Sequence, residues 1–200
     1  SAVAFNKQMT KEALKQHGVL MAEHQEVAKD IDTDIVTISN EIKAKFGKEY
    51  IIKPTSSGSS FGVQFVGEDD SLEAALEQAL DKYERVLVEE FIQGREATSA
   101  TLEKFRNEDI YVFPTIEIVT PRNAQFFNTD NKYDGKTLEI CPSNFAYGDR
   151  VKIADVSALV HDVLNLSQYS RSDFIVSEKG VYFLEVNTLP GLTAESLYPK

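Results

Sequence analysis

The chain contains 200 residues, 42% of them apolar, and its 21 Lys plus Arg against 32 Asp plus Glu give a net charge of -11. This length and apolar content suffice for one large or two small globular units, and no stretch approaches the ~20 apolar residues of a membrane-spanning helix, so a soluble chain with no membrane partner is expected. The acidic balance disfavours a nucleic-acid partner, whose phosphates require a basic surface.

The single cysteine, Cys141, excludes an internal disulfide framework, and we interpret it as an inert small residue rather than a nucleophile. No apolar leader segment begins the chain, so a reducing cytoplasm is the expected location. The sequence lacks an initiator methionine and stops at Lys200 just as a helix should be developing. We therefore expect it to be cut at both ends.

The first predicted helix is capped by Asn6, runs through Leu14 and ends at Gly18. Lys7 lies in its first turn, where a cation is slightly unfavourable to the helix dipole. It is either an ordinary solvated side chain or is held there for an anion. Residues 23–32 are polar enough for an exposed connection or an edge strand. A second helix follows, with an apolar stripe of Ile35, Ile38, Ile42 and Phe46.

Residues 50–66 predict two short strands around a tip rich in glycine and serine. Consecutive N–H groups and hydroxyls in such a tip can close on an anion, and Lys53 at the end of the first strand adds a positive charge. The order differs from a Walker loop, in which the lysine follows the glycines and a helix comes next. The tip is therefore either a phosphate-binding loop or a flexible turn.

A third amphipathic helix begins after Ser71, and its buried stripe comprises Leu72, Ala75, Leu76, Ala79 and Leu80. The following strand, 85–92, is apolar except for Arg85, Glu89 and Glu90, and a further strand contains Glu96 and Thr98. Acids at strand ends can accept hydrogen bonds from a nucleotide's amino group or ribose hydroxyls. They can equally be solvated charges of an edge strand.

Residues 110–119 predict a strand in which Pro114 marks an edge or a bulge. The long segment 120–149 lacks periodicity, and its aromatic content favours a functional loop over disorder. A helix is predicted for 151–166, with Ile153, Val156 and Val163 inward and Leu159 or Val160 between them. His161 on this helix is interpreted as an exposed residue.

Residues 170–186 predict a hairpin with a three-residue loop, 178–180. If Ser177 faces Val181, Asp173 lies opposite Glu185 and Arg171 lies opposite Asn187, all on one face. The core face then contains Phe174, Val176, Tyr182, Leu184 and Val186. Two facing carboxylates repel unless a cation lies between them, and oxygen ligands suit Mg²⁺, which shares its shell with phosphates. The alternative is a solvated polar face.

Four segments together resemble the ATP-grasp fold and, more narrowly, the D-alanine–D-alanine ligases. They are K53-P-x-x-x-G-S-S-x-G62, V88-E-E-F-I-x-G-x-E96, R171-x-D173 and E185-V-N-T-L-P-G-L-T193, of which the last is the most specific. The resemblance implies an α+β ATP-grasp architecture with mainly antiparallel sheets that clasp a nucleotide. It divides the chain into a central nucleotide-binding subdomain, 1–96, and a truncated C-terminal metal and substrate subdomain, 97–200.

The resemblance also implies residue roles. Lys7, Lys53 and Lys132 would contact ATP phosphates, the loop with Ser59 and Ser60 would close over them, and Glu89 and Glu96 would hold adenine and ribose, with the main chain of Glu90 and Ile92 at the adenine edge. Asp173, Glu185 and Asn187 would bind two Mg²⁺ ions, or Mn²⁺ in their place. Arg171 and the Gly191 N–H would stabilise an oxyanion, and Tyr133, Ser196 and Leu197 would shape the second-substrate pocket.

The implied reaction is ATP-dependent joining of two D-alanines through an acyl phosphate, for peptidoglycan and hence for cell-wall biogenesis and cell shape. The family places a further domain before Lys7, so we expect this chain to bind Mg-ATP but to ligate poorly; a full-length parent could form a homodimer. Two alternatives remain open at this point. The chain could belong to another ligase, forming D-Ala–D-Lac, D-Ala–D-Ser or another dipeptide, or it could be a noncatalytic nucleotide-binding module.

Overall fold

The computed structural model describes residues 2–30, 33–56, 62–119, 138–193 and 196. Within these residues the strands form two sheets, and every strand pairing in both sheets is antiparallel. The smaller sheet has the order β1-β4-β2-β3, and the larger has the order β10-β9-β5-β7-β8, with β6 also paired to β5. Helices and antiparallel sheets together give the predicted α+β class.

The four-stranded sheet is built from the first part of the chain. Its elements are β1 (His24–Ala28), α3 (Ile35–Phe46), β2 (Tyr50–Pro54), β3 (Gln64–Val66), α4 (Leu72–Lys82) and β4 (Arg85–Glu90). The Asp34 carboxylate caps α3 through the Thr37 N–H, and the Ser71 hydroxyl caps α4 through the Ala74 N–H. The predicted apolar stripe of α4 is buried along its whole length against one face of the sheet. The strand β1 lies at the edge, as the polar segment 23–32 allowed.

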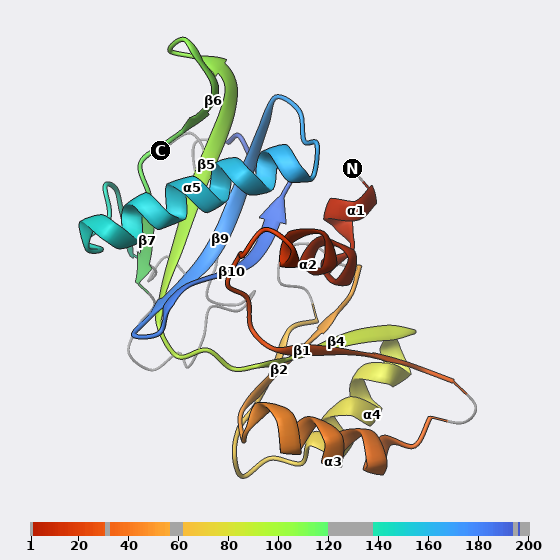
Figure 1. The fold of residues 1–200 in the computed structure, drawn as a ribbon. Helices are drawn as coiled ribbons and strands as arrows, with labels where there is room; N and C mark the ends of the chain where they lie inside the picture. The colour runs from red at the N-terminus through yellow and green to blue at the C-terminus, as the bar shows by residue number, and fades with distance from the viewer. Residues whose placement is uncertain (1, 31–32, 57–61, 120–137, 194–195, 197–200) are drawn as a thin grey trace.

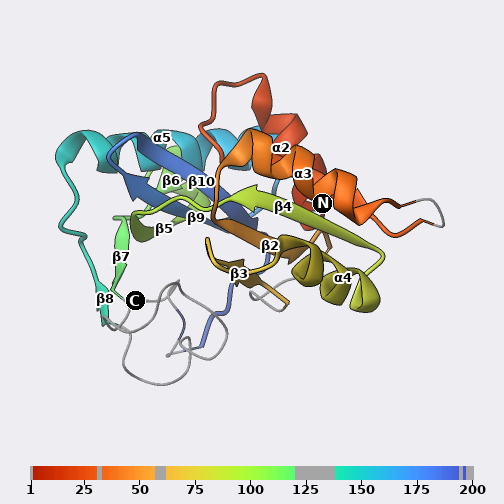
Figure 2. The ribbon, with the colours of Figure 1, turned by 90° about the horizontal axis from the view of Figure 1, so that it is seen from below.

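The six-stranded sheet is built from the second part. Its elements are β5 (Arg95–Phe105), β6 (Glu108–Val112), β7 (Ile116–Val119), β8 (Leu138–Ile140), α5 (Tyr147–Val163), β9 (Tyr169–Ser177) and β10 (Gly180–Asn187). Figures 1 and 2 both show α5 lying along this sheet, whereas α3 and α4 lie against the smaller sheet. The N-terminal helices α1 (Ala2–Phe5) and α2 (Lys7–Lys15) join the core of the larger sheet, into which Leu14 is inserted.

The hairpin of β9 and β10 pairs Asp173 with Glu185 as predicted, but its loop and the register next to the loop differ from the prediction. Ser177 pairs with Gly180 rather than with Val181, so the loop has two residues instead of three. An irregularity between Phe183 and Glu185 then adds one residue to β10, and Asp173 pairs with Glu185 as predicted. A bulge changes which side chains share a face. The predicted core face is therefore wrong at two positions: Val181 and Phe183 occupy it in place of Tyr182 and Leu184.

Three further predictions need correction. The predicted strand 110–119 is two strands, because Pro114 has no N–H for the ladder and ends the first one. The helix α5 begins at Tyr147, four residues before the predicted start, and ends at Val163. His161 is 1% exposed rather than exposed, because α5 turns this side chain onto the sheet beside the Thr101 and Ser170 hydroxyls.

No helix among the described residues combines the length and the apolar composition that crossing a lipid bilayer requires.

Candidate functional site

A pocket lies between the two sheets, and strand alternation determines which side chains reach it. In the smaller sheet, Ile52 and Val88 face the helices, so Ile51 and Glu89 face the other way and pair across β2 and β4. In the larger sheet the core face looks toward α5, and the opposite face carries the predicted polar residues. The pocket is lined by Ala22, Ile51, Lys53, Val63, Glu89, Glu90, Phe91, Ile92, Glu96, Asp173, Ile175, Leu184 and Glu185.

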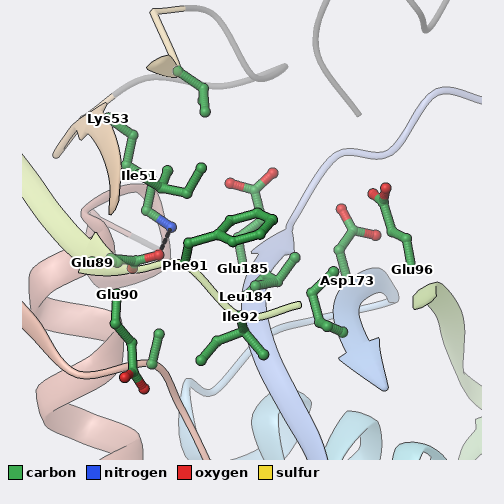
Figure 3. Close-up of a pocket in the computed structure, with 13 residues that line it drawn as sticks. Ile51, Lys53, Glu89, Glu90, Phe91, Ile92, Glu96, Asp173, Leu184 and Glu185 are labelled. Atoms are coloured by element: carbon green, nitrogen blue, oxygen red, sulfur yellow. Dashed lines mark ion pairs between the residues drawn. The ribbon is translucent and has the colours of Figure 1, made fainter. Parts of the chain in front are cut away.

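Charged groups lie on both sides of an apolar centre in this pocket. Figure 3 shows Lys53 and Glu89 on one side of the Phe91 ring, and Asp173 and Glu96 on the other. The aromatic and aliphatic side chains between them offer a surface for a flat ring, and the charged groups offer contacts to polar substituents. This composition suits a ligand with an aromatic part and a strongly polar part.

The Glu89 carboxylate is buried between two lysines. Its Oε1 lies 2.9 Å from Lys11 Nζ and its Oε2 lies 2.8 Å from Lys53 Nζ, and all three side chains are at most 8% exposed. Burial alone raises the pKa of Glu89, but the two lysine charges outweigh it and hold the pKa at about 2. Glu89 is therefore ionised, as a buried carboxylate must be if it is to offset buried ammonium groups.

Helix α2 connects the two halves of the pocket at its first turn. The Lys7 backbone N–H donates to the carbonyl of Thr55, which directly follows β2 of the smaller sheet. Lys7 Nζ lies 3.7 Å from Glu185 Oε2 on β10 of the larger sheet. Lys7 is 9% exposed, so it is not the solvated side chain that the sequence left as one alternative. Burial lowers the pKa of Lys7, and the Glu185 charge opposes this effect.

The Asp173 carboxylate receives hydrogen bonds on both oxygens. Thr98 Oγ1 donates to Oδ1 over 2.6 Å, and Arg171 donates through Nε to Oδ1 and through Nη2 to Oδ2 over 3.0 and 2.9 Å. Asn187 Nδ2 donates to Oδ2 over 3.0 Å. The predicted partners of the hairpin face are thus brought together in one network. The Asp173 charge raises the pKa of Arg171, which keeps the guanidinium charged.

The donor types around Glu185 fit a hard divalent cation. Asp173, Glu185 and Asn187 supply oxygen ligands only, which is the chemistry that Mg²⁺ prefers, and the Glu185 carboxylate lines the pocket. Within the described ranges, no group of three or more His, Cys, Asp or Glu side chains is arranged to hold a metal ion. The predicted set supplies only two carboxylates and one amide. These do not fill the coordination shell of Mg²⁺, so an ion bound here would take further oxygen atoms from a bound ligand.

The nucleobase edge predicted at Glu90 and Ile92 lies where β4 ends. The Glu90 N–H donates to the Glu23 carbonyl over 3.0 Å, so the main-chain donor of Glu90 is used within the fold. The Phe91 N–H donates to the Glu49 carbonyl over 2.9 Å. Both bonds hold the end of β4 against its neighbours, and Ile92 and Glu96 follow it along the pocket wall.

Gly191 and Ser196 lie close together beyond the end of β10. A Cβ atom on Gly191 would approach Ser196 Oγ to 2.6 Å, so glycine permits this contact. The Ser196 hydroxyl also receives the Thr193 N–H over 3.2 Å. The two predicted substrate residues are therefore neighbours, although neither lines the pocket between the sheets.

Five predicted site residues lie outside the described part of the chain: Ser59, Ser60, Lys132, Tyr133 and Leu197. Sequence reasoning missed two residues that the structure places at the site, Lys11 and Thr98. Lys11 follows Lys7 by one helical turn on the face that carries Leu14, and that spacing was the available signal. Thr98 lies one strand away from Asp173, so nothing local indicated their contact.

The family model for the C-terminal region of D-ala D-ala ligases matches residues 13–200. A D-alanine–D-alanine ligase of Syntrophobacter fumaroxidans is 33% identical over 201 residues, which cover 100% of this chain and 62% of that protein. The chain therefore spans about 60% of the length of such relatives.

Solved structures with the same fold include ligases with different second substrates. The VanG D-Ala:D-Ser ligase of Enterococcus faecalis superposes with a TM-score of 0.82 at 28% identity, covering 99% of this chain and 56% of that one. A D-alanine–D-alanine ligase of Bacillus anthracis complexed with ATP gives a TM-score of 0.75 at 25% identity, covering 98% of this chain and 57% of that one. These likenesses bear out the expected ATP-grasp fold.

Proposed function

Because the chain belongs to the D-alanine–D-alanine ligase family, we propose that it forms the nucleotide- and metal-binding part of an ATP-dependent ligase that joins two D-alanines for peptidoglycan synthesis. The observation that carries this proposal is the single pocket in which Lys53, Glu89, Glu96, Asp173 and Glu185 meet. These residues come from both sheets, and their charges are divided as a nucleotide with an attached metal ion requires.

The proposed nucleotide contacts follow the two ends of the pocket. Lys7 and Lys53 bind phosphate oxygens, and Glu96 binds the ribose hydroxyls. Glu89 contributes to the adenine side while it remains paired with its two lysines, since each carboxylate oxygen has two lone pairs. Main-chain groups at Glu90 and Ile92 read the adenine edge. Three residues outside the described ranges complete the phosphate contacts in this proposal: Ser59, Ser60 and Lys132.

The metal-binding residues in this proposal are Asp173, Glu185 and Asn187, which would hold two Mg²⁺ ions, or Mn²⁺ in their place. When bound, the ions supply charge neutralisation for the phosphates of the nucleotide. Thr98 and Arg171 orient the Asp173 carboxylate through the bonds described above. An oriented carboxylate loses less freedom when it exchanges one of these donors for a cation.

The acyl-transfer chemistry is assigned to the region next to the metal ligands. Arg171 remains charged and lies beside the pocket, so it can stabilise a developing oxyanion together with the Gly191 N–H. Tyr133, Ser196 and Leu197 shape the second-substrate pocket in this proposal. Because the chain spans about 60% of its relatives, the complete reaction, a cytoplasmic location and any homodimer are proposed for a protein of the relatives' length.

A second candidate is a ligase with another acceptor, favoured by the close fold match to a D-Ala:D-Ser ligase. The pocket residues bind nucleotide and metal and do not contact an acceptor, so they serve either reaction. Phosphate release by a relative-length protein with D-alanine, D-serine or D-lactate as acceptor separates the two candidates. The division into subdomains 1–96 and 97–200 stays a prediction, since α1 and α2 pack with the second subdomain's core.

The test of nucleotide binding uses calorimetry on this chain with the nonhydrolysable analogue AMP-PNP. We expect binding in Mg²⁺, and we expect Glu185→Gln to weaken it about tenfold or more, which corresponds to about 1.4 kcal/mol. In EDTA the same variant should change affinity by less than about threefold. Glu178→Gln, an exposed position on the β9–β10 loop, is the matched control. The proposal would be contradicted if the wild type does not bind AMP-PNP, or if Glu185→Gln weakens binding equally with Mg²⁺ and in EDTA.

A further inference from the structure

Lys11 is the most deeply buried charged residue beside the pocket that the proposed function does not use. It lies on α2, one turn after Lys7, and its side chain is 1% exposed. The next turn of the same face carries Leu14, which is fully buried in the core of the larger sheet. Because Leu14 fixes this face of the helix against the core, the Lys11 ammonium is held at a defined position beside Glu89.

Each oxygen of Glu89 has its own lysine. Lys11 lies 2.9 Å from Oε1 and Lys53 lies 2.8 Å from Oε2, so the two ammonium groups together determine how the carboxylate is turned. Of the two lysines, only Lys53 lines the pocket, where Figure 3 shows it paired with Glu89. Lys11 pairs with the other carboxylate oxygen and is not among the residues that line the pocket. Two ammonium groups against one carboxylate leave the cluster with one excess positive charge, and that charge can be shared with a ligand only through Lys53.

Other charged groups act on this cluster from neighbouring elements. Lys7 on the same helix, and Glu23 and His24 at the start of β1, are within electrostatic range of Lys11 or Glu89. Lys7 has its own partner in Glu185, and burial lowers the pKa of His24 and so favours its neutral form. Glu23 is exposed, where water screens its charge. None of these groups replaces Lys11 at the Glu89 oxygen.

We propose that Lys11 is a positioning residue for the polyphosphate end of the nucleotide: it occupies one Glu89 oxygen so that Glu89 does not neutralise Lys53. Without Lys11, Glu89 and Lys53 form a neutral pair, and Lys53 offers less attraction to an anion. The inference rests on the proposed function of the pocket, and it adds Lys11 as a residue on which the charge of the pocket depends. Removing one charge from a water-poor cluster should cost about tenfold in affinity for a polyanion and little for a neutral ligand.

The experiment compares AMP-PNP with Mg²⁺ and adenosine, which carries no phosphate. The ratio of the two dissociation constants, adenosine over AMP-PNP, measures what the phosphates contribute. We expect Lys11→Met to lower this ratio about tenfold and Lys11→Arg to keep it within about threefold, because arginine retains the charge. Lys15→Met, on the exposed face of the same helix, should leave it unchanged. If Lys11→Met does not fold, Lys11→Gln, whose amide can still donate to Glu89, carries the same expectation.

A double variant distinguishes charge from simple structural support. Lys11→Met with Glu89→Gln removes one charge of each sign and leaves Lys53 with its positive charge, so the ratio should return to within about threefold of the wild type. A purely structural role would weaken adenosine and AMP-PNP alike. Equal losses, an unchanged ratio in a folded Lys11→Met, or no recovery in the double variant would overturn this inference alone. Failure of the wild type to bind AMP-PNP would overturn the proposed function with it.

Discussion

Replacing Glu89 by glutamine should destabilise the protein strongly, because it leaves two buried lysines without a counter-charge. The fall in the pKa of Glu89 from the ordinary 4.5 to about 2 means that the fold favours its ionised form by about 3 kcal/mol. Removal of one partner from a buried ion pair costs about 3–5 kcal/mol in general, which agrees in size. We therefore expect Glu89→Gln to lower the free energy of unfolding by about 3 kcal/mol at pH 7.

The assay is urea denaturation followed by far-ultraviolet circular dichroism, since the chain has no tryptophan. Because the folded-state pKa of Glu89 is depressed, its stabilisation is fully present above about pH 5 and is lost as the pH falls toward about 2. The difference between wild type and variant should therefore shrink over that range. Glu84→Gln, an exposed position beside β4, should change stability by less than about 0.5 kcal/mol. A cost below about 1 kcal/mol for Glu89→Gln at pH 7, or a difference that has not shrunk by pH 2.5, would refute the reasoning.

Three further variants test the packing of the larger sheet, each by urea denaturation. Gly94→Ala should destabilise the protein by about 1–3 kcal/mol, because the added Cβ would lie 2.5 Å from both Ile175 Cγ2 and the Val176 carbonyl oxygen. Gly148→Ala should stabilise it by up to about 1 kcal/mol, because Gly148 has open space around it in the first turn of α5. Equal effects of the two substitutions would contradict this. Burial lowers the pKa of His161, so the stability that its neutral form contributes is present above about pH 6.5 and is lost as the pH falls. His161→Asn should therefore reduce the loss of stability between pH 7 and 5.5, and parallel profiles for the wild type and the variant would contradict this.

Local patterns in the sequence predicted most elements and much of the polar site. Alternation along 170–186 placed Asp173 opposite Glu185, and the bulge at Leu184 preserved that pairing although the loop was one residue shorter than predicted. The caps at Asn6 and Ser71 and the stripe of α4 were correct, because these interactions span only one or two turns. The same local reasoning failed for His161, since whether a polar helix residue is buried depends on what the helix packs against.

In the regular parts of the strands, the sequence by itself determined which side chains share a face, because the two-residue period of a strand is a property of its own backbone. At the bulge in β10 the structure decided this instead. The sequence thereby predicted the Asp173, Glu185 and Asn187 group, and it indicated Lys53 and Glu89 as separate candidates. Only the tertiary structure decided that the two sheets turn these faces toward one pocket. It also decided that Lys11 reaches Glu89 from α2. Such contacts depend on how distant elements pack, and the free energy of that packing is not encoded in any local period.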